Sequence, residues 1–275
     1  MTLAASNRGL AEQEFKQGVT IVRSRPAHIW FETSAVCNLR CVQCPREYPG
    51  WQGQEAQFDS SVFAKIARYF PYLTHLNLTS LGEPLLADIF WQIVGDDRAR
   101  GIDLAVNSNG TLLTEKNVDR LLNSGLNLIN ISLDAATAPT YKKIRRGNLD
   151  KVIAGIRRLI ARRKELGATR LQVWMNMTLM MENIRELPLF IELAADLAVD
   201  GVDVWHLNMS SDMGELADWQ LIHDNWTFVY NDQSLNNAPA LSNEMIRRAQ
   251  EVAEERGFNF TPKPSHRGTP IWLPE

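Results

Sequence analysis

The sequence predicts an α/β fold, a partial (β/α)6 TIM-like barrel followed by a short C-terminal appendage. Six short apolar runs alternate with longer helix-like stretches, which is the pattern of consecutive βαβ units. Such units build parallel sheets with right-handed crossovers, and six in succession favour an incomplete barrel over a sandwich. The chain has 275 residues, 45% of them hydrophobic and 22% charged, so one large domain with a substantial core is expected.

The elements are expected in regular order along the chain. Strands are predicted at 28–36, 73–79, 102–106, 128–133, 171–179 and 202–207. Helices are predicted at 60–69, 88–100, 114–125, 141–144, 151–166, 186–198 and 242–256. Gly101 suits a helix stop, the turn residues from Asn107 to Gly110 end the third strand, and Pro188 suits a first helical turn.

These elements divide the chain into three parts. Residues 1–26 are predicted to be an N-terminal arm, either poorly ordered or a short helix. Residues 27–210 are predicted to be the partial barrel. Residues 211–275 begin with a mixed polar and aromatic stretch without a clear period. We therefore interpret them as a C-terminal appendage or a truncated extension.

Charge and hydrophobic patterning exclude several classes of protein. The formal net charge of -3 argues against a dedicated nucleic-acid-binding protein, which usually carries a strong basic excess. No run of 18 apolar residues occurs, so no membrane span is predicted. The N-terminal segment also lacks the apolar stretch of a secretory signal. We therefore expect a cytoplasmic protein.

The chain has only three cysteines, Cys37, Cys41 and Cys44, with the spacing C-x3-C-x2-C. An odd number within eight residues is not a disulfide framework. The group directly follows the first predicted strand, and loops after strands form the catalytic face of a parallel barrel. Iron–sulfur clusters usually take four thiolates, so three would leave one iron of a cube open to a small molecule.

Zinc held by these thiolates and one histidine is the alternative on spacing alone. The histidines available as a fourth ligand show no ligand spacing with one another: His28, His75, His206, His223 and His266.

Further motifs follow the next three predicted strands. They are Gly82-Glu83-Pro84, Asn107-Ser108-Asn109-Gly110 and Ser132-Leu133-Asp134-Ala135. Alone, each is also typical of turns and helix caps. Together with the cysteine spacing, they resemble segments of the radical S-adenosylmethionine (SAM) superfamily, whose fold is a partial (β/α)6 barrel. The resemblance covers about residues 27–210.

The resemblance implies a [4Fe-4S] cluster on Cys37, Cys41 and Cys44, with SAM bound at the fourth iron. Reductive cleavage of SAM would yield a 5′-deoxyadenosyl radical that abstracts hydrogen from a peptide or small-molecule substrate. An electron donor such as flavodoxin or ferredoxin is implied as partner. The implied SAM contacts are Gly82, Glu83, Pro84, Ser108, Asn109, Ser132, Asp134 and Arg145.

The same resemblance suggests individual roles for these contacts. The backbone of the Gly82 segment would meet the amino group of SAM. Ser108 and Ser132 would donate to its carboxylate or ribose. Asp134 would touch the ribose or orient a neighbour. Arg145 would pair with the SAM carboxylate through a bidentate fork, unless its helix only presents a solvated cationic face.

The segments Cys-Asn-Leu-Arg-Cys and Gly-Glu-Pro-Leu-Leu look most like the SPASM/twitch branch, but the auxiliary-cluster cysteines of that branch are absent after Cys44. Gln43 stands where the family often has an aromatic residue near SAM, and Tyr48 or Trp51 are candidate substitutes. The motifs identify no general acid or base. Two alternatives remain open, a non-catalytic zinc or cluster scaffold and an RNA-modifying radical SAM enzyme.

Overall fold

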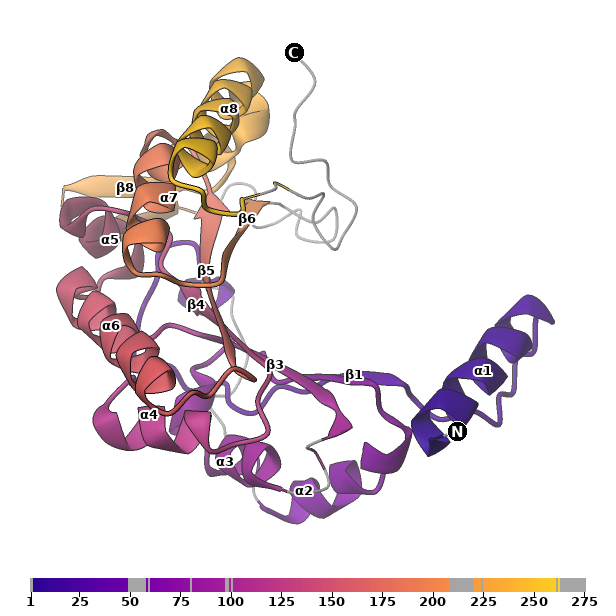
Figure 1. The fold of residues 1–275 in the computed structure, drawn as a ribbon. Helices are drawn as coiled ribbons and strands as arrows, with labels where there is room; N and C mark the ends of the chain where they lie inside the picture. The colour runs from indigo at the N-terminus through magenta and orange to yellow at the C-terminus, as the bar shows by residue number, and fades with distance from the viewer. Residues whose placement is uncertain are drawn as a thin grey trace.

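The computed structural model describes residues 2–48, 58, 60–79, 81–96, 99, 101–207, 220–223, 225–260 and 262. Its centre is a six-stranded parallel sheet in which the strands lie in sequence order. The strands are β1 (His28–Trp30), β2 (His75–Asn77), β3 (Asp103–Ser108), β4 (Leu128–Ser132), β5 (Gln172–Leu179) and β6 (Gly201–His206). The predicted six-stranded α/β fold is therefore confirmed, and Figure 1 shows the sheet curving into an open arc.

The helices cover the outer side of this arc (Figure 1). They are α2 (Ser60–Ala67), α3 (Asp88–Gly95), α4 (Glu115–Leu122), α5 (Ala138–Arg145), α6 (Leu149–Glu165), α7 (Leu187–Asp196) and α8 (Pro239–Glu255). Side chains cap two of the helices, because Thr114 accepts from the Asn117 amide and Asn148 from the Lys151 amide. None of the helices within the described residues is both long enough and apolar enough to cross a membrane.

The main hydrophobic core lies between the sheet and these helices. Alternate residues of each strand point outward into it, as with Val173, Met175 and Met177 on β5, which are fully buried. The residues between them face the concave side of the sheet. The strand period of two thus separates an apolar outer face from an inner face that is free to bind ligands.

The first strand is much shorter than the predicted 28–36. It ends at Trp30, and the chain then leaves the sheet. The Gly82 and Glu83 amides donate to the carbonyls of Ser34 and Val36 at 3.0 and 2.8 Å. The apolar run therefore continues as a loop that pairs with the segment after β2.

The N-terminal arm contains a 14-residue helix, α1 (Leu3–Lys16), which Figure 1 shows beyond β1 at the edge of the sheet. Two buried polar side chains fix it to the following segment. Asn7 donates to the Arg25 carbonyl at 2.9 Å, and Glu14 accepts from the Arg23 amide at 2.8 Å. These long-range bonds explain why the helix forms without a strong apolar stripe.

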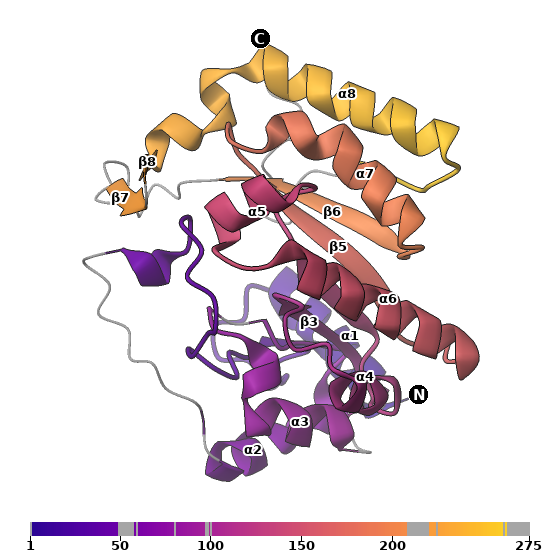
Figure 2. The same cartoon turned by 90° about the vertical axis from the view of Figure 1, so that its left-hand side faces the viewer.

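After β6 the described chain includes a hairpin that the sequence pattern did not predict. Strands β7 (Gln220–His223) and β8 (Trp226–Val229) pair antiparallel. Figure 2 shows the hairpin beyond α5 and shows α8 lying over α7. Phe228 and Tyr230 pack with Val42 of the cysteine loop in a second apolar cluster. The interpretation of residues 211–275 as an appendage or a truncated extension stays a prediction.

Candidate metal centre and binding cavity

The three cysteines lie on the loop that follows β1, and all are free thiols. Backbone bonds shape this loop, because the Cys44 amide donates to the Cys41 carbonyl at 3.0 Å and Val42 donates to Ile144 at 2.9 Å. The Cys41 thiol lies 3.9 Å from the Arg145 carbonyl. The end of α5 therefore holds the middle of the loop in place.

The thiols have the chemistry of soft metal ligands in a buried setting. Burial raises the pKa of Cys41 to about 12 and also raises the pKa of Cys44. Both are therefore neutral thiols near pH 7 in the metal-free chain, and metal binding must displace their protons. A three-thiolate donor set of this kind fits an iron–sulfur cluster with one open iron.

A single zinc ion fits the geometry poorly. Within the described ranges, no three His, Cys, Asp or Glu side chains converge closely enough to hold one metal ion. Zinc would need the thiolates and an imidazole around one point. Of the histidines considered, His266 lies outside the described residues. A cluster offers a separate iron to each thiolate, so it does not require the three thiols to meet at one point.

The segment after β2 packs directly against the cysteine loop. A Cβ added at Gly82 would lie 2.4 Å from the carbonyl oxygens of both Ser34 and Val36. Any side chain at this position would therefore push the two backbones apart. Gly82 and Glu83 border the cavity described below, whereas Pro84 begins a short buried 3-10 turn, Pro84–Leu86, and does not.

Glu83 ties the ends of β2 and β3 together. Its side chain is fully buried, and its two oxygens accept from the Ser108 hydroxyl at 2.8 Å and the Asn109 amide at 2.7 Å. Burial raises the pKa of Glu83, and the Asn109 amide opposes that shift. The Ser108 hydroxyl therefore already donates its hydrogen bond to Glu83.

Asn109 links this unit to the first cysteine. Its side-chain amide nitrogen donates to the side-chain oxygen Oδ1 of Asn38 at 2.8 Å and lies 3.7 Å from the Cys37 sulfur. The next residue, Gly110, has a φ of +70°, which favours glycine and turns the chain away from the site. The β3 loop therefore provides a polar neighbour for a cysteine thiolate.

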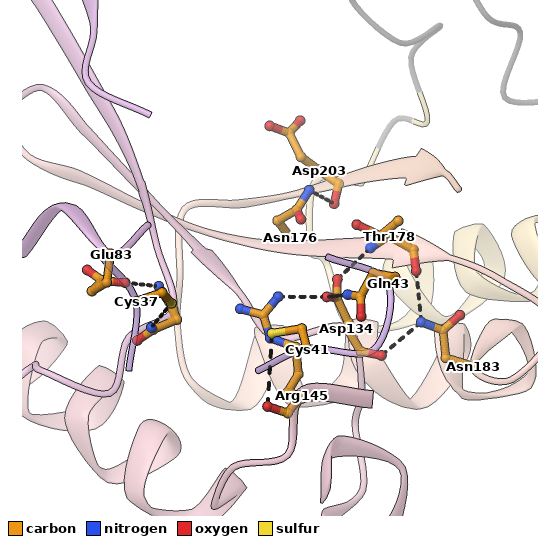
Figure 3. A network of polar contacts seen from close by, with 11 residues as sticks. Cys37, Cys41, Gln43, Glu83, Asp134, Arg145, Asn176, Thr178, Asn183 and Asp203 are labelled. Carbon is orange, nitrogen blue, oxygen red and sulfur yellow. Dashed lines mark hydrogen bonds and ion pairs between the residues drawn. The ribbon is translucent and has the colours of Figure 1, made fainter. Parts of the chain in front are cut away.

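A buried network connects the cysteine loop with β4, β5 and α5 (Figure 3). Asp134 Oδ2 accepts from Gln43 Nε2 at 2.8 Å and from Arg145 Nη1 at 2.9 Å. Asp134 Oδ1 accepts from the Thr178 amide at 2.7 Å, and Asn183 donates to the Asp134 carbonyl at 2.8 Å. The Asp134 carboxylate is thus fully engaged by protein donors.

This network bears on two of the predicted contacts. Asp134 does not border the cavity, so its contacts favour the orienting role over the ribose contact. Arg145 borders the cavity, but one of its terminal nitrogens is bound to Asp134. Its buried Nε has no hydrogen-bond partner among the described residues. Asp134 therefore holds Arg145 in place at the cavity wall.

The concave side of the sheet encloses a cavity of about 800 Å³. The structure brings most of the predicted site residues to its wall: Cys37, Cys41, Cys44, Gly82, Glu83, Ser108, Asn109, Ser132 and Arg145. Gln43 borders it as well. Tyr48 packs against the second apolar cluster, and Trp51 lies outside the described residues.

The cavity wall also includes residues that belong to none of the sequence motifs. Asn130, Thr178 and Asp203 contribute to its wall from β4, β5 and β6. Each lies on the concave face of the sheet, toward which every second side chain of a strand points. The alternation of apolar and polar residues in 201–206 was the available signal for this face.

The model of the radical SAM superfamily matches residues 31–194. A tungsten-containing aldehyde ferredoxin oxidoreductase cofactor-modifying protein of Pyrococcus furiosus is 29% identical, covering 66% of this chain and 51% of the relative. A probable GTP 3′,8-cyclase of Methanocaldococcus jannaschii is 32% identical over 58% of this chain and 52% of the relative. The chain thus spans about half the length of these relatives.

Solved structures share the fold at low sequence identity. Streptococcus suis SuiB bound to its precursor peptide SuiA matches with a TM-score of 0.66 and 14% identity, covering 94% of this chain and 53% of SuiB. The enzyme anSMEcpe with bound AdoMet matches with a TM-score of 0.58 and 14% identity, covering 84% of this chain and 61% of that protein. Enzymes of the matched family use a [4Fe-4S] cluster and SAM. The family match, the cysteine loop and the partial barrel together establish that this chain belongs to the radical SAM superfamily.

Proposed function

We propose that this chain binds a [4Fe-4S] cluster through Cys37, Cys41 and Cys44, cleaves SAM reductively and abstracts hydrogen from a peptide or small-molecule substrate. One observation carries the proposal. The cysteine loop, the Gly82-Glu83 segment and the Ser108-Asn109 segment are hydrogen-bonded into one unit at the wall of one cavity.

A reduced cluster of this family supplies the electron that splits SAM into methionine and a 5′-deoxyadenosyl radical. The remaining work falls to the chain. The three cysteines bind three irons, and the Asn109 amide lies against the Cys37 sulfur. Such outer contacts orient metal ligands and adjust their electron donation. The second apolar cluster, with Val42 and Phe228, excludes water from the back of the cysteine loop.

The segment after β2 is suited to the amino group of SAM. The amides of Gly82 and Glu83 are committed to Ser34 and Val36. Carbonyl oxygens therefore remain as the groups this segment can offer, and they are acceptors for an ammonium. Glu83 holds the segment in place through Ser108 and Asn109.

Arg145 and Ser132 are suited to the carboxylate and ribose. Arg145 borders the cavity, and a guanidinium is a strong partner for a carboxylate. Ser132 lies on the cavity wall at the end of β4. Asp134 acts as a positioning residue, because it fixes the guanidinium of Arg145 and the side chain of Gln43.

Relatives support both substrate classes. SuiB is described with a precursor peptide, and other relatives are named as a GTP cyclase and an AdoMet-dependent heme synthase. We therefore propose a peptide or small-molecule substrate. A flavodoxin or ferredoxin is proposed as the electron donor.

The test is anaerobic reconstitution of the full chain with iron and sulfide. We expect about four irons per chain, and release of 5′-deoxyadenosine from SAM after dithionite is added. Cys41→Ala should lose the cluster and the product while circular dichroism shows a retained fold. Uptake of zinc without iron would instead support the scaffold alternative. Salt-dependent binding of tRNA would support the RNA-modifying alternative.

A further inference from the structure

We propose that a second pocket, beside the end of α2, binds the phosphate group of a small phosphate ester. The pocket has a volume of about 330 Å³, which lies at the lower end of the range for small-molecule sites. Its lining residues are Arg25, Arg68, Tyr69 and Tyr72, and none of them borders the larger cavity beside the cysteines. The inference therefore goes beyond the proposed function and does not depend on the cluster or on SAM.

A short turn after α2 places the two tyrosines. This 3-10 turn, η2, spans Phe70–Tyr72. Phe70 is 3% exposed and packs edge to face against Phe63 of α2, with 6.2 Å between the ring centroids. Burial of Phe70 anchors the turn in the core. Tyr69 and Tyr72, on either side of this anchor, are half-buried and border the pocket.

Asn7 of α1 joins two of the lining residues through their backbones. Asn7 is only 6% exposed, and its Nδ2 donates to the carbonyls of Arg25 at 2.9 Å and of Tyr72 at 3.5 Å. Its Oδ1 accepts from the Arg25 amide at 2.7 Å. The helical arm therefore fixes the backbone of Arg25 beside η2. A ligand would not need to order this segment, which lowers the cost of binding.

The two arginines bring two positive charges to one pocket. Within the described part of the chain, the hydrogen bonds of Arg25 are made by its backbone, so its guanidinium has no ion pair there. Arg68 lies over the ring of Tyr69, 4.8 Å from the centroid, and its Nη2 donates to the phenol oxygen at 2.8 Å. None of the described lining residues is acidic. An anion between the two guanidinium groups would therefore relieve their mutual repulsion.

The side chains of this pocket offer hydrogen-bond donors. A guanidinium has five N–H donors and no acceptor. The oxygen of Tyr69 already accepts from Arg68, which leaves its O–H to donate. The hydroxyl of Tyr72 has no partner among the residues that the structure describes, and it can donate as well. A ligand for such a site must supply several acceptor oxygens and a negative charge, and a phosphate group has both.

The size and charge of the pocket favour a small ester over a polymer. A volume of about 330 Å³ leaves room for a carbon group beyond the phosphate, and the rings of Tyr69 and Tyr72 give that group apolar contacts. A nucleic-acid backbone would require a longer row of cations to neutralise successive phosphates. The formal net charge of -3 also argues against such a partner.

The test uses three aromatic probes of different charge: phenyl phosphate, benzyl alcohol and benzylammonium, titrated calorimetrically into the full chain at constant ionic strength. We expect phenyl phosphate to bind at least about tenfold more tightly than the other two. Arg25→Gln and Arg68→Gln should each weaken its binding about tenfold, because each removes one charged donor. Arg23→Gln is the matched control, since Arg23 is 84% exposed, pairs with Glu14 and does not border the pocket. It should leave the affinity within about twofold.

Equal binding of the three probes by the wild-type chain would overturn the proposal, and this comparison needs no variant to fold. Unchanged phenyl phosphate binding in both Arg25→Gln and Arg68→Gln would overturn it as well, because the ligand would then bind elsewhere. An equal loss in Arg23→Gln would show a general effect of surface charge and would also overturn it. A short RNA that binds more tightly than phenyl phosphate and loses affinity in the same two variants would assign the arginines to a nucleic-acid backbone and overturn the small-ester ligand.

Discussion

Gln43 donates a hydrogen bond from Nε2 to Asp134 Oδ2 at 2.8 Å, which connects the cysteine loop to the end of β4. Gln43 lies between Cys41 and Cys44 in the sequence, so this bond acts on the loop between two proposed cluster ligands. Asp134 also accepts a hydrogen bond from the guanidinium of Arg145. The backbone carbonyl of Arg145 accepts from the Cys41 thiol. The position that often carries an aromatic residue in the family thus serves here as a polar anchor.

Loss of this anchor should weaken retention of the cluster. Gln43→Ala should lose iron to a chelator about tenfold faster than the wild-type chain, because outer contacts of metal ligands typically matter on this scale. Iron release followed by absorbance under anaerobic conditions measures the effect. Gln13→Ala, an exposed change on α1, is the control and should release iron at the wild-type rate. Identical rates for both variants would show that the Gln43 bond does not hold the loop.

Asp134→Asn should destabilise the fold strongly. The change keeps the size of the side chain, and asparagine tolerates the left-handed φ of 60° at this position. It leaves the guanidinium of Arg145, whose side chain is only 10% exposed, without its charge partner. Removing one partner of a buried pair costs roughly 3–5 kcal/mol in the free energy of unfolding. Urea unfolding followed by circular dichroism measures it.

The control for this change is an exposed ion pair of the same type. Asp119 contacts Arg162 at 2.9 Å, but both side chains are more than a third exposed. Asp119→Asn should therefore leave the unfolding midpoint nearly unchanged, since water replaces the lost partner. A midpoint shift as large as that of Asp134→Asn would contradict the assigned importance of the buried network.

Gly82→Ala should separate the two backbones that meet beside the cysteines. The added Cβ has no flexible side chain to displace, because its nearest atoms are the backbone oxygens of Ser34 and Val36 and the nitrogen of Val36. We expect a loss of about 1–3 kcal/mol in the free energy of unfolding and a lower iron content after reconstitution. Gly9→Ala on α1 is the control, because nothing lies within 4 Å of its added Cβ. It should stabilise the helix by about 0.5–1 kcal/mol. A fully loaded, equally stable Gly82→Ala chain would contradict the close packing described here.

Glu83→Gln tests the buried carboxylate that joins the β2 and β3 loops. If the amide keeps its oxygen toward Ser108, its nitrogen faces the Asn109 amide and leaves that donor without a partner. The expected cost is about 1–3 kcal/mol in the free energy of unfolding. Chemical unfolding at pH 5 and above measures the cost.

The same variant gives a pH test with a definite sign. Burial raises the pKa of Glu83 above 4.5, so in the window between 4.5 and the raised value the folded state binds more protons than the unfolded state. Stability from this group is then present below pH 4.5 and is lost as the pH rises through the window. The stability advantage of the wild-type chain over Glu83→Gln should therefore shrink as the pH rises. An advantage that grows with pH would mean that the three donors to Glu83, from Ser108, Asn109 and the Leu85 amide, outweigh its burial.

The order and type of the strands and helices could be predicted because each follows from local periodicity. The predicted 171–179 and the observed β5 (Gln172–Leu179) agree closely, since the strand is buried and bounded by turn residues. The predicted 28–36 was too long, because residues 34 and 36 pair with the loop after β2 instead of the sheet. The β7–β8 hairpin was missed because its stability comes from packing on Val42, which periodicity does not reveal.

The candidate site divides in a similar way. Spacing alone predicts Cys37, Cys41 and Cys44 as cluster ligands, because a cluster needs several thiolates on one short loop. The partners of Ser108 and Asp134 could not be predicted, since Glu83 and Gln43 reach them from distant parts of the chain. Asn130 and Asp203 carry no motif, and only the sheet brings them within 3.2 Å.

The sequence by itself determined the βαβ order and the family, and it predicts thiolates as the metal ligands, because these depend on residue identity and local spacing. The tertiary structure alone decided which partners the buried polar groups find. Asp134 accepts hydrogen bonds from Gln43, Arg145 and Thr178, whereas the Arg145 Nε and the Asn130 Oδ1 are buried without a partner among the described residues. The physical reason is that a buried polar group must find its partner in space, and that partner here lies tens of residues away along the chain.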